Sequence, residues 1–289
     1  MAALIKGSLP IVEVVLRNDE DFDTLCKIHE NYPHVLLGAG QVLNTKQVDK
    51  AIQAGAQFIV TNGFNTDTIG YCVDHQILII PGCSTVTELE NALAYGLTTV
   101  NLFSVDHSLE FDHVSKLTKM YDDMSFIINN VSDPSDITEF LNNNQVLACG
   151  TTQIIDKTLM DANDFEGISQ LIKKAILTTL GLTLKHVAVN ASSATSKDLA
   201  EHFAEIFGGV PRQTSKGYFG SEFVEIMNNG IGEHGHIAVG CNDVRRARRY
   251  FESLGYSFDE STIMNKNNKL NFIYFQEEFG GFKVHLINN

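Results

Sequence analysis

Residues 77–104 read ILIIPGCSTVTELENALAYGLTTVNLFS, and this stretch carries the pattern of a strand, a helix and a second strand. The runs 77–83 and 99–104 are almost continuously apolar, which is typical of strands covered on both faces. Between them, Thr85 and Glu88 have the spacing of a capping box at the start of a helix. The stretch therefore predicts a unit of two parallel strands joined by a crossover helix.

The same alternation extends over residues 9–181. A helical apolar pattern begins at about Asp164 and places Ile168, Leu171, Ile172 and Ala175 on one buried face before the chain reaches Gly181. The chain up to this glycine therefore reads as an α/β domain with a parallel sheet. The other strand candidates are LPIVEVVLR (9–17), VLLGAGQV (35–42), QFIVTN (57–62), SFIINN (125–130) and VLACGTT (146–152).

An internal repeat follows from Lys185 onward. KHVAVN (185–190) and GHIAVG (235–240) each precede an apolar-faced helix, and each half then continues into extended segments that end in FVEIMN (223–228) and FKVHLIN (282–288). Two βαβββ modules are predicted, and neither could bury its sheet face alone. The change of pattern predicts two domains, 1–183 and 184–289.

Composition excludes several classes of protein. The 289 residues carry a formal net charge of -14, which disfavours binding to nucleic acid unless a local basic surface outweighs the net negative charge. The one dense basic run, at residues 245–249, reads as the solvated face of an amphipathic helix. Five scattered cysteines suggest reduced thiols rather than a disulfide framework. Without a secretory signal or a membrane-length apolar run, the expected protein is cytoplasmic and makes no membrane contact.

Four dispersed motifs resemble the 2-keto-3-deoxy-6-phosphogluconate/4-hydroxy-2-oxoglutarate aldolases. VEVVLR (12–17) is similar to the family's LEVTLR, GAGQVLN (38–44) to GAGTVLN, AGAQFIVTNG (54–63) to AGAQFAISPG, and IPGCSTVTELENALAYGL (80–97) to IPGISTVSELMLGMDYGL. The resemblance runs from about Ala3 to Leu180. It implies a TIM-barrel-like parallel barrel, carbon–carbon lyase ancestry and a small 2-keto acid as ligand.

The resemblance also assigns catalytic positions. Glu13 matches the glutamate that relays protons, and Arg17 matches the arginine that binds the substrate carboxylate. Their spacing of four would put both on one face of a strand. The family's Schiff-base lysine corresponds to Asn101, whose amide cannot act as a nucleophilic amine. The sequence therefore predicts that class I aldolase activity is lost or severely reduced.

The resemblance assigns further substrate-binding positions, and some depart from the family. Gln41 replaces a threonine, and Asn129-Asn130-Val131 replaces the glycines that cradle the substrate phosphate. The family's first strand has no counterpart, so seven strands are expected, with the first and last unpaired across a gap. We expect a subunit contact or docked domain to cover that gap, and the family resemblance implies a homo-oligomer, commonly a trimer. The assigned substrate-binding positions are Gln41, Asn62, Asn129, Asn130 and Gly150.

The second domain, from Lys185 to Asn289, resembles the glyoxalase-like vicinal-oxygen-chelate fold. Proteins of that fold take metal ligands from the first and last strand of each module, and the matching positions are His186, Glu225, His236 and His285. Three imidazoles and one carboxylate suit Zn, Ni, Fe, Mn or Co, and the donor set does not choose among these metals. His234 is an alternative ligand or an outer partner.

Three functional hypotheses remain open from the sequence. The first is an aldolase-family protein that binds a small keto acid through Glu13 and Arg17 without class I chemistry. In the second, a metal in the C-terminal domain supports isomerase, lyase or dioxygenase chemistry. The third is a non-catalytic protein that senses a ligand or assembles with others.

Overall fold

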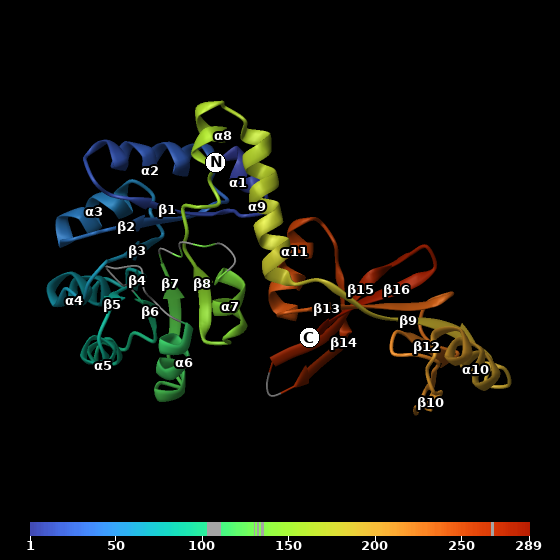
Figure 1. Cartoon of the computed structure of the whole chain (residues 1–289). Coiled ribbons are helices and arrows are strands. Elements are labelled where there is room, and N and C mark those ends of the chain that lie inside the picture. The colour runs from blue at the N-terminus through green and yellow to red at the C-terminus, as the bar shows by residue number, and fades with distance from the viewer. Residues whose placement is uncertain (103–110, 130, 132, 134–135, 267–268) are drawn as a thin grey trace. The chain divides into compact units, whose positions relative to one another are not determined.

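The computed structural model describes residues 1–102, 111–129, 131, 133, 136–266 and 269–289 (Figure 1). It divides into two compact units, Met1–Ile176 and Leu177–Asn289. The division falls inside helix α9 (Phe165–Leu180), before the boundary at residue 183 that the change of sequence pattern predicts. Among the described helices, none combines the length and the apolar character needed to cross a membrane.

The N-terminal unit is built from parallel strands that alternate with helices. Its strands form two four-stranded sheets, β1-β2-β3-β4 and β5-β6-β7-β8, and every pairing is parallel. The strands are β1 (Ile11–Val15), β2 (Leu36–Gly40), β3 (Phe58–Val60), β4 (Ile79–Ile80), β5 (Gly82–Cys83), β6 (Thr99–Leu102), β7 (Ser125–Ile128) and β8 (Val146–Cys149). The helices are α1 (Ala2–Lys6), α2 (Glu20–Asn31), α3 (Thr45–Gln53), α4 (Thr66–Asp74), α5 (Val86–Ala94), α6 (Phe111–Met120), α7 (Asp136–Asn142), α8 (Lys157–Asp161) and α9.

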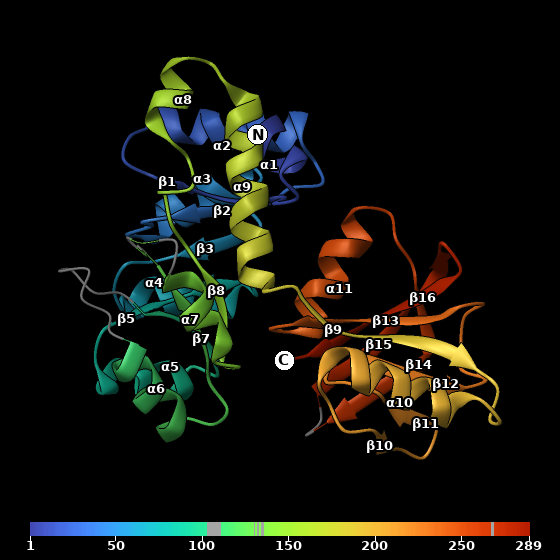
Figure 2. The ribbon, with the colours of Figure 1, turned by 45° about the vertical axis from the view of Figure 1, so that its right-hand side comes forward.

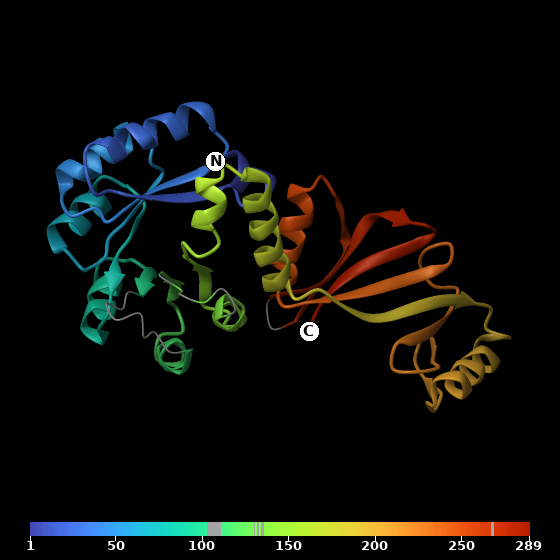
Figure 3. The ribbon, with the colours of Figure 1, turned by 45° about the horizontal axis from the view of Figure 1, so that its top comes forward.

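Pro81 joins the two sheets. It separates β4 from β5, and its carbonyl accepts a hydrogen bond of 2.8 Å from the backbone N–H of Asn101 in β6. The run 77–83 is therefore one strand that pairs first with β3 and then with β6, which leaves seven strand runs, as the sequence predicts. α5 begins at a capping box of Thr85 and Glu88, also as predicted. Figure 3 shows α2 lying along the β1–β2 pair, which it contacts.

The edges β1 and β8 are not paired with each other in the part of the chain that the structure describes. Both edges expose apolar side chains, with Ile11 40% and Leu147 51% accessible. The expected cover by a subunit or a docked domain stays a prediction. On α9, Ile168 and Ile172 are buried as expected, but Leu171 is 38% exposed, so the buried face of this helix is narrower than predicted.

Phe126 on β7 lies at the centre of the second sheet's core and is completely buried. We expect Phe126→Ala to lower the free energy of unfolding of this unit by about 3–5 kcal/mol, because truncation leaves a large cavity in a packed core. Denaturant unfolding measures the change. Phe165→Ala is the matched control, since Phe165 is half-exposed at the start of α9 and its loss should cost less than about 1 kcal/mol. Equal losses in the two variants would contradict the assigned core.

The C-terminal unit is one eight-stranded sheet with two helices on it. The strand order β10-β11-β12-β9-β13-β16-β15-β14 gives two βαβββ modules, as the sequence repeat predicts. In each module the first strand pairs in parallel with the last, and the modules meet where β9 and β13 pair antiparallel. The strands are β9 (Thr183–Ala191), β10 (Arg212–Gln213), β11 (Gly217–Phe219), β12 (Val224–Asn228), β13 (Gly235–Cys241), β14 (Phe258–Lys266), β15 (Lys269–Phe279) and β16 (Phe282–Asn288).

The two helices, α10 (Ser196–Phe207) and α11 (Val244–Ser253), each pack on the later strands of their own module (Figure 2). α10 buries Ala200 against Val224 and Ile226, which alternate along β12 with Glu225. Because side chains alternate between the faces of a strand, Glu225 points to the opposite face. The helices therefore cover one face of the sheet and leave the other for the site.

Candidate functional site

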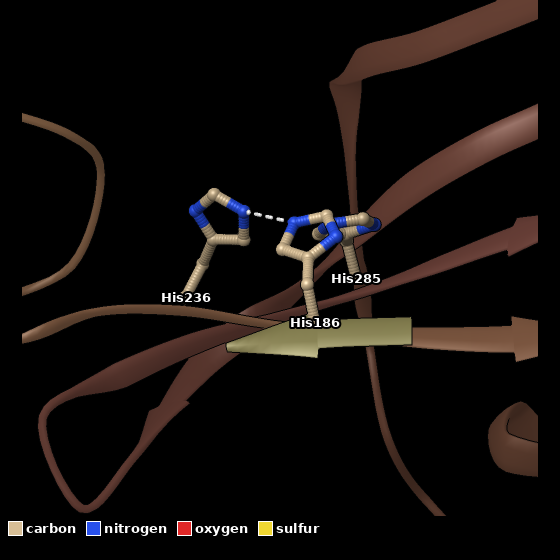
Figure 4. Close-up of side chains that lie close together, drawn as sticks. All are labelled: His186, His236 and His285. Carbon is tan, nitrogen blue, oxygen red and sulfur yellow. Dashed lines mark hydrogen bonds between the residues drawn. The ribbon is translucent and has the colours of Figure 1, made fainter. Parts of the chain in front are cut away.

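Side chains from four strands of the C-terminal sheet meet at one point. His186 lies on β9, Glu225 on β12, His236 on β13 and His285 on β16. Figure 4 shows the three histidines converging, with one ring nitrogen of each within 4.8 Å of the others. Nε2 of His186 is 3.0 Å from Nε2 of His236, and Oε2 of Glu225 is 3.4 and 3.6 Å from these two atoms. The structure thus brings together all four residues that the sequence assigns to the metal site.

Strand register explains this convergence. Ala188 on β9 is in register with Glu225 on one side and His236 on the other. Ala238 on β13 is in register with His186 and His285 in the same way. The four site residues therefore occupy equivalent positions in the two modules. Both alanines are fully buried, and their methyl groups leave the space above the central strands to the larger side chains.

Burial controls the charge of the site. Desolvation, followed by the charges of neighbouring groups, lowers the pKa of His236 to about 4 and that of His285 to about 3. Desolvation also lowers the pKa of His186 and raises that of Glu225. The histidines are thus neutral at neutral pH, so their contacts with Glu225 are not ion pairs. Neutral imidazole is the form that binds a metal ion.

The geometry fits a divalent metal ion. Two ligands that are each about 2.1 Å from one ion lie about 3 to 3.5 Å apart, close to the separations between His186, His236 and Glu225. The Nε2 atoms of His186 and His236 and the carboxylate of Glu225 point at one another, and two neutral ring nitrogens and a carboxylate oxygen cannot all be satisfied by hydrogen bonds among themselves. An ion held between these atoms would satisfy them together.

His234, the alternative ligand from the sequence, lies outside this cluster. Its side chain is exposed and its ring packs edge-on against Phe282 at 5.8 Å between centroids. The strand β13 begins at Gly235, so the alternation that directs His236 into the site does not extend back to His234. The expectation that His234 lies at the site is therefore wrong.

Aromatic side chains that the sequence did not single out surround the histidines. The rings of Phe272 and Tyr274 lie 4.3 and 5.0 Å from that of His285, and the ring of Phe219 lies 5.6 Å from that of His186. Burial and the charge of Glu225 raise the pKa of Tyr274 to about 12, so the phenol keeps its proton. Alternation along the third strand of each module could have identified Phe219 and Tyr274, since they pair with Glu225 and His285.

The neutral histidines make the stability of the metal-free protein pH-dependent. Their folded-state pKa values lie below the ordinary value near 6.5, so the unfolded chain binds more protons as pH falls from about 6.5 towards 3. We expect the melting temperature of chelator-treated protein to fall between pH 6.5 and 5, above the range where most carboxylates titrate. Glu225, with its raised pKa, acts in the opposite direction because its protonation is favoured in the folded state.

Thermal denaturation of the wild type and of the double variant His236→Gln/His285→Gln tests this dependence. The variant should lose less stability over the same pH interval, because it lacks the two groups that charge only on unfolding. His202→Gln removes an exposed histidine of α10 and should retain the wild-type slope. Identical slopes in the double variant and the wild type would show that these histidines are not held neutral.

The N-terminal unit places the aldolase-like positions within its strands and just beyond their ends. Glu13 on β1 is partly buried, and desolvation raises its pKa against the opposing effect of a hydrogen bond with the side chain of Asn129. Two glycines make room for this pair. A Cβ atom at Gly40 would lie 2.0 Å from Oε1 of Glu13, and one at Gly150 would lie 2.0 Å from Oδ1 of Asn129.

Asn101 is buried in β6 and is 1% exposed. Its Nδ2 donates to the carbonyl of Thr61 at 3.5 Å, while its Oδ1 has no hydrogen-bond partner in the described part of the chain. The nearest lysine before it in sequence is Lys50 and the nearest after it is Lys116, and both are exposed and paired with aspartates, Lys50 with Asp19 and Lys116 with Asp112. The position that matches the family's lysine therefore holds an amide inside the sheet.

The other sequence-assigned positions are dispersed around this end of the sheet. Gln41 follows β2 with a left-handed backbone (φ 56°), and Asn62 is exposed on the rim of a pocket of about 270 Å³. Asn130 lies outside the described residues. The pocket is lined by Val42, Leu43, Thr61, Asn62, Gly63, Phe64 and Asn65.

Arg17 differs from expectation. β1 ends at Val15, so strand alternation does not place Arg17 on the face of Glu13. Its side chain is exposed, and its backbone N–H donates to Oδ2 of Asp21 at 2.6 Å. The argument from a spacing of four residues is therefore wrong for Arg17, because the chain has already left the sheet.

Comparison with known proteins identifies the N-terminal unit. Residues 1–171 match the family described as KDPG and KHG aldolase. A 2-dehydro-3-deoxy-phosphogluconate aldolase of Treponema pallidum is 32% identical over 174 residues, which cover 60% of this chain and 83% of that protein. The KHG/KDPG aldolase of Escherichia coli is 27% identical over 60% of this chain and 82% of its own length.

Solved structures agree with this match. A 2-keto-3-deoxy-6-phosphogluconate aldolase of Zymomonas mobilis is 25% identical with a TM-score of 0.56, over 60% of this chain and 82% of that one. The KDPG aldolase of Legionella pneumophila, with pyruvate captured as a covalent carbinolamine, has a TM-score of 0.57 at 22% identity, over 60% and 84% of the two chains. The N-terminal unit thus has the TIM-barrel-like fold of these aldolases. Since the family match spans more than half of the sequence, this chain belongs to the KDPG and KHG aldolase family.

Proposed function

We propose that this chain is a metal-binding member of its family, in which a glyoxalase-like vicinal-oxygen-chelate domain carries the chemistry. The observation that supports the proposal is the convergence of His186, Glu225, His236 and His285 from equivalent positions of two βαβββ modules. These four side chains would hold one divalent ion. When bound, such an ion supplies Lewis acidity towards a ligand with two neighbouring oxygens.

The chain's own residues define what such a site can do. The neutral imidazoles and the Glu225 carboxylate present nitrogen and oxygen donors that suit Zn, Ni, Fe, Mn or Co. The aromatic side chains of Phe219, Phe272 and Tyr274 line the cluster. The protonated phenol of Tyr274 can donate a hydrogen bond to an oxygen of a ligand held over His285. These properties favour an isomerase or lyase that stabilises an enolate.

Metal content tests the proposal directly. Protein purified without chelator should contain about one divalent metal per chain by elemental analysis, a chelator should remove it, and added metal should restore it. Circular dichroism before and after chelation shows whether the sheet persists. Folded protein that takes up no Zn, Ni, Fe, Mn or Co would overturn the proposal.

A second function is proposed for the barrel, which we infer binds a small 2-keto acid without forming a Schiff base. Two observations favour it. The partly buried pair of Glu13 and Asn129 keeps a carboxyl with a raised pKa in the middle of β1, and Asn101 offers an amide rather than an amine. Pyruvate trapping with borohydride distinguishes this binding from class I catalysis.

A further inference from the structure

A row of side chains crosses the C-terminal sheet and leads from its edge to the histidines. Residues in register on neighbouring strands share a face of the sheet, so Arg212 and Phe219 lie on the same face as Glu225. The edge strand β10 therefore presents Arg212 towards the site from the side of the first module. The row in register is Arg212, Phe219, Glu225, Ala188 and His236.

The Arg212 side chain extends over the ring next to the histidines. Its Cζ atom lies 4.8 Å from the centroid of the Phe219 ring, whose edge-on contact with His186 spans 5.6 Å between centroids. Stacking on an aromatic face holds a guanidinium flat while leaving its N–H groups open to a ligand. Arg212 thus lies one ring beyond the histidine cluster, on its solvent side.

Lys216 adds a second positive charge at the same edge. It lies in the turn between β10 and β11 and is exposed, as is Arg212. The turn joins β10 to β11, and Phe219 of β11 packs against His186. Arg212 and Lys216 therefore carry their charges on the hairpin that borders the site.

These two cations differ from the arginines of α11. There Arg245 pairs with Asp243 at 2.8 Å and Arg248 with Glu252 at 2.8 Å, so carboxylates of the chain compensate the helix charges. No ion pair among the described residues includes Arg212 or Lys216. In a chain with a net charge of -14, two uncompensated cations beside a cluster of donors are available to an anion from solution.

The second module carries the opposite charge at the equivalent position. Asp259 is in register with Tyr274, which is in register with His285, so Asp259 is the counterpart of Arg212 and Tyr274 that of Phe219. Lys283 is in register with His236 and so shares the site face, where its Nζ donates to the carbonyl of Gln276 at 2.7 Å. The equivalent edge positions of the two modules thus carry a cation on β10 and an anion on β14, which favours β10 for the distal end of an anionic ligand.

We propose that the ligand of this site is a 2-oxo or 2-hydroxy acid with a second anionic group, which Arg212 and Lys216 bind while the acid end faces the histidines. The inference rests on the proposed metal centre and specifies its substrate class. A carboxylate or a phosphate ester supplies the same chemistry, since both accept hydrogen bonds from a guanidinium and an ammonium group. The short carbon chain of this ligand would lie along the Phe219 ring, between its acid end at the histidines and its anionic group at Arg212.

Matched ligands on the Co²⁺-loaded full chain test the proposal. The visible spectrum of Co²⁺ reports only on ligands that reach the metal, so keto-acid binding in the barrel does not interfere. We expect 2-oxoglutarate to bind about tenfold more tightly than 2-oxopentanoate, and 3-phosphoglycerate more tightly than glycerate. The pair with the larger ratio identifies the distal group as carboxylate or phosphate. Absence of preference in both pairs would overturn the inference.

Charge variants separate this inference from the metal centre on which it rests. Arg212→Gln/Lys216→Gln should remove the preference within each pair and leave Co²⁺ uptake unchanged. Lys197→Gln/Arg249→Gln removes the same two charges from exposed positions on α10 and α11 and should keep the preference. A preference that survives in the first double variant overturns the anion site alone. A chain that takes up no Co²⁺ overturns the metal centre and the inference together.

Discussion

Replacing His236 with alanine is expected to lower the affinity of the chain for a divalent metal ion by on the order of 100-fold or more. His236 is 6% exposed, and its Nε2 lies 3.0 Å from that of His186 and 3.6 Å from the Glu225 carboxylate, at the centre of the donor cluster. Loss of an outer partner of a metal ligand typically costs 10- to 100-fold in affinity, and loss of the ligand itself costs at least as much. Competition titration against a chromophoric chelator measures the change.

Three further variants sharpen this experiment. Glu225→Gln keeps the shape and an oxygen donor but removes the negative charge, so its affinity should lie between the wild type and His236→Ala. His234→Ala and His202→Ala each remove an exposed histidine outside the cluster and should bind as the wild type does. If His234→Ala lost as much affinity as His236→Ala, the assigned donor set would be wrong.

The resemblance to the vicinal-oxygen-chelate fold predicted this donor set, and the strand register of the structure explains why its four members meet. His186 and His236 stand at the same place in KHVAVN and GHIAVG, whereas Glu225 is the third residue of FVEIMN and His285 the fourth of FKVHLIN. Only the register shows that these last two are equivalent, with Glu225 opposite Ala188 and His285 opposite Ala238. Alternation decides which face of the sheet each side chain points to. The register between neighbouring strands decides which side chains on that face meet.

The same principle explains where sequence reasoning failed. Arg17 and His234 lie just outside a strand, where alternation no longer determines direction. After β1 the chain turns because the Asp21 carboxylate accepts hydrogen bonds from the backbone N–H groups of Arg17 and Asn18. Arg212 was missed because β10 is only two residues long and has no apolar pattern of its own. Its place on the site face comes from pairing with β11, which is a tertiary property.

Incubation of the chain with pyruvate and borohydride is expected to give no covalent adduct in the N-terminal unit. In a Schiff-base aldolase a lysine amine attacks the keto carbon, the carbinolamine loses water, and borohydride reduces the resulting iminium to a stable secondary amine. Asn101 offers an amide whose nitrogen donates to the Thr61 carbonyl. Lys46 and Lys50 lie on α3 and not on a strand, and Lys50 is exposed and paired with Asp19, so neither is expected to replace the missing lysine. Intact mass spectrometry and peptide mapping measure the adduct.

Asn101→Lys should restore at most weak trapping. The new side chain would start from a position that is 1% exposed, and its amine would need a depressed pKa to attack a carbonyl. The Glu13 carboxyl would also have to exchange its hydrogen bond with Asn129 for one to the substrate. Asn101→Gln is the matched control, since it lengthens the side chain without an amine and should give no adduct. Robust trapping by the unmodified protein, mapped to any lysine of the N-terminal unit, would disprove loss of the nucleophile and make an active aldolase the better description of the barrel.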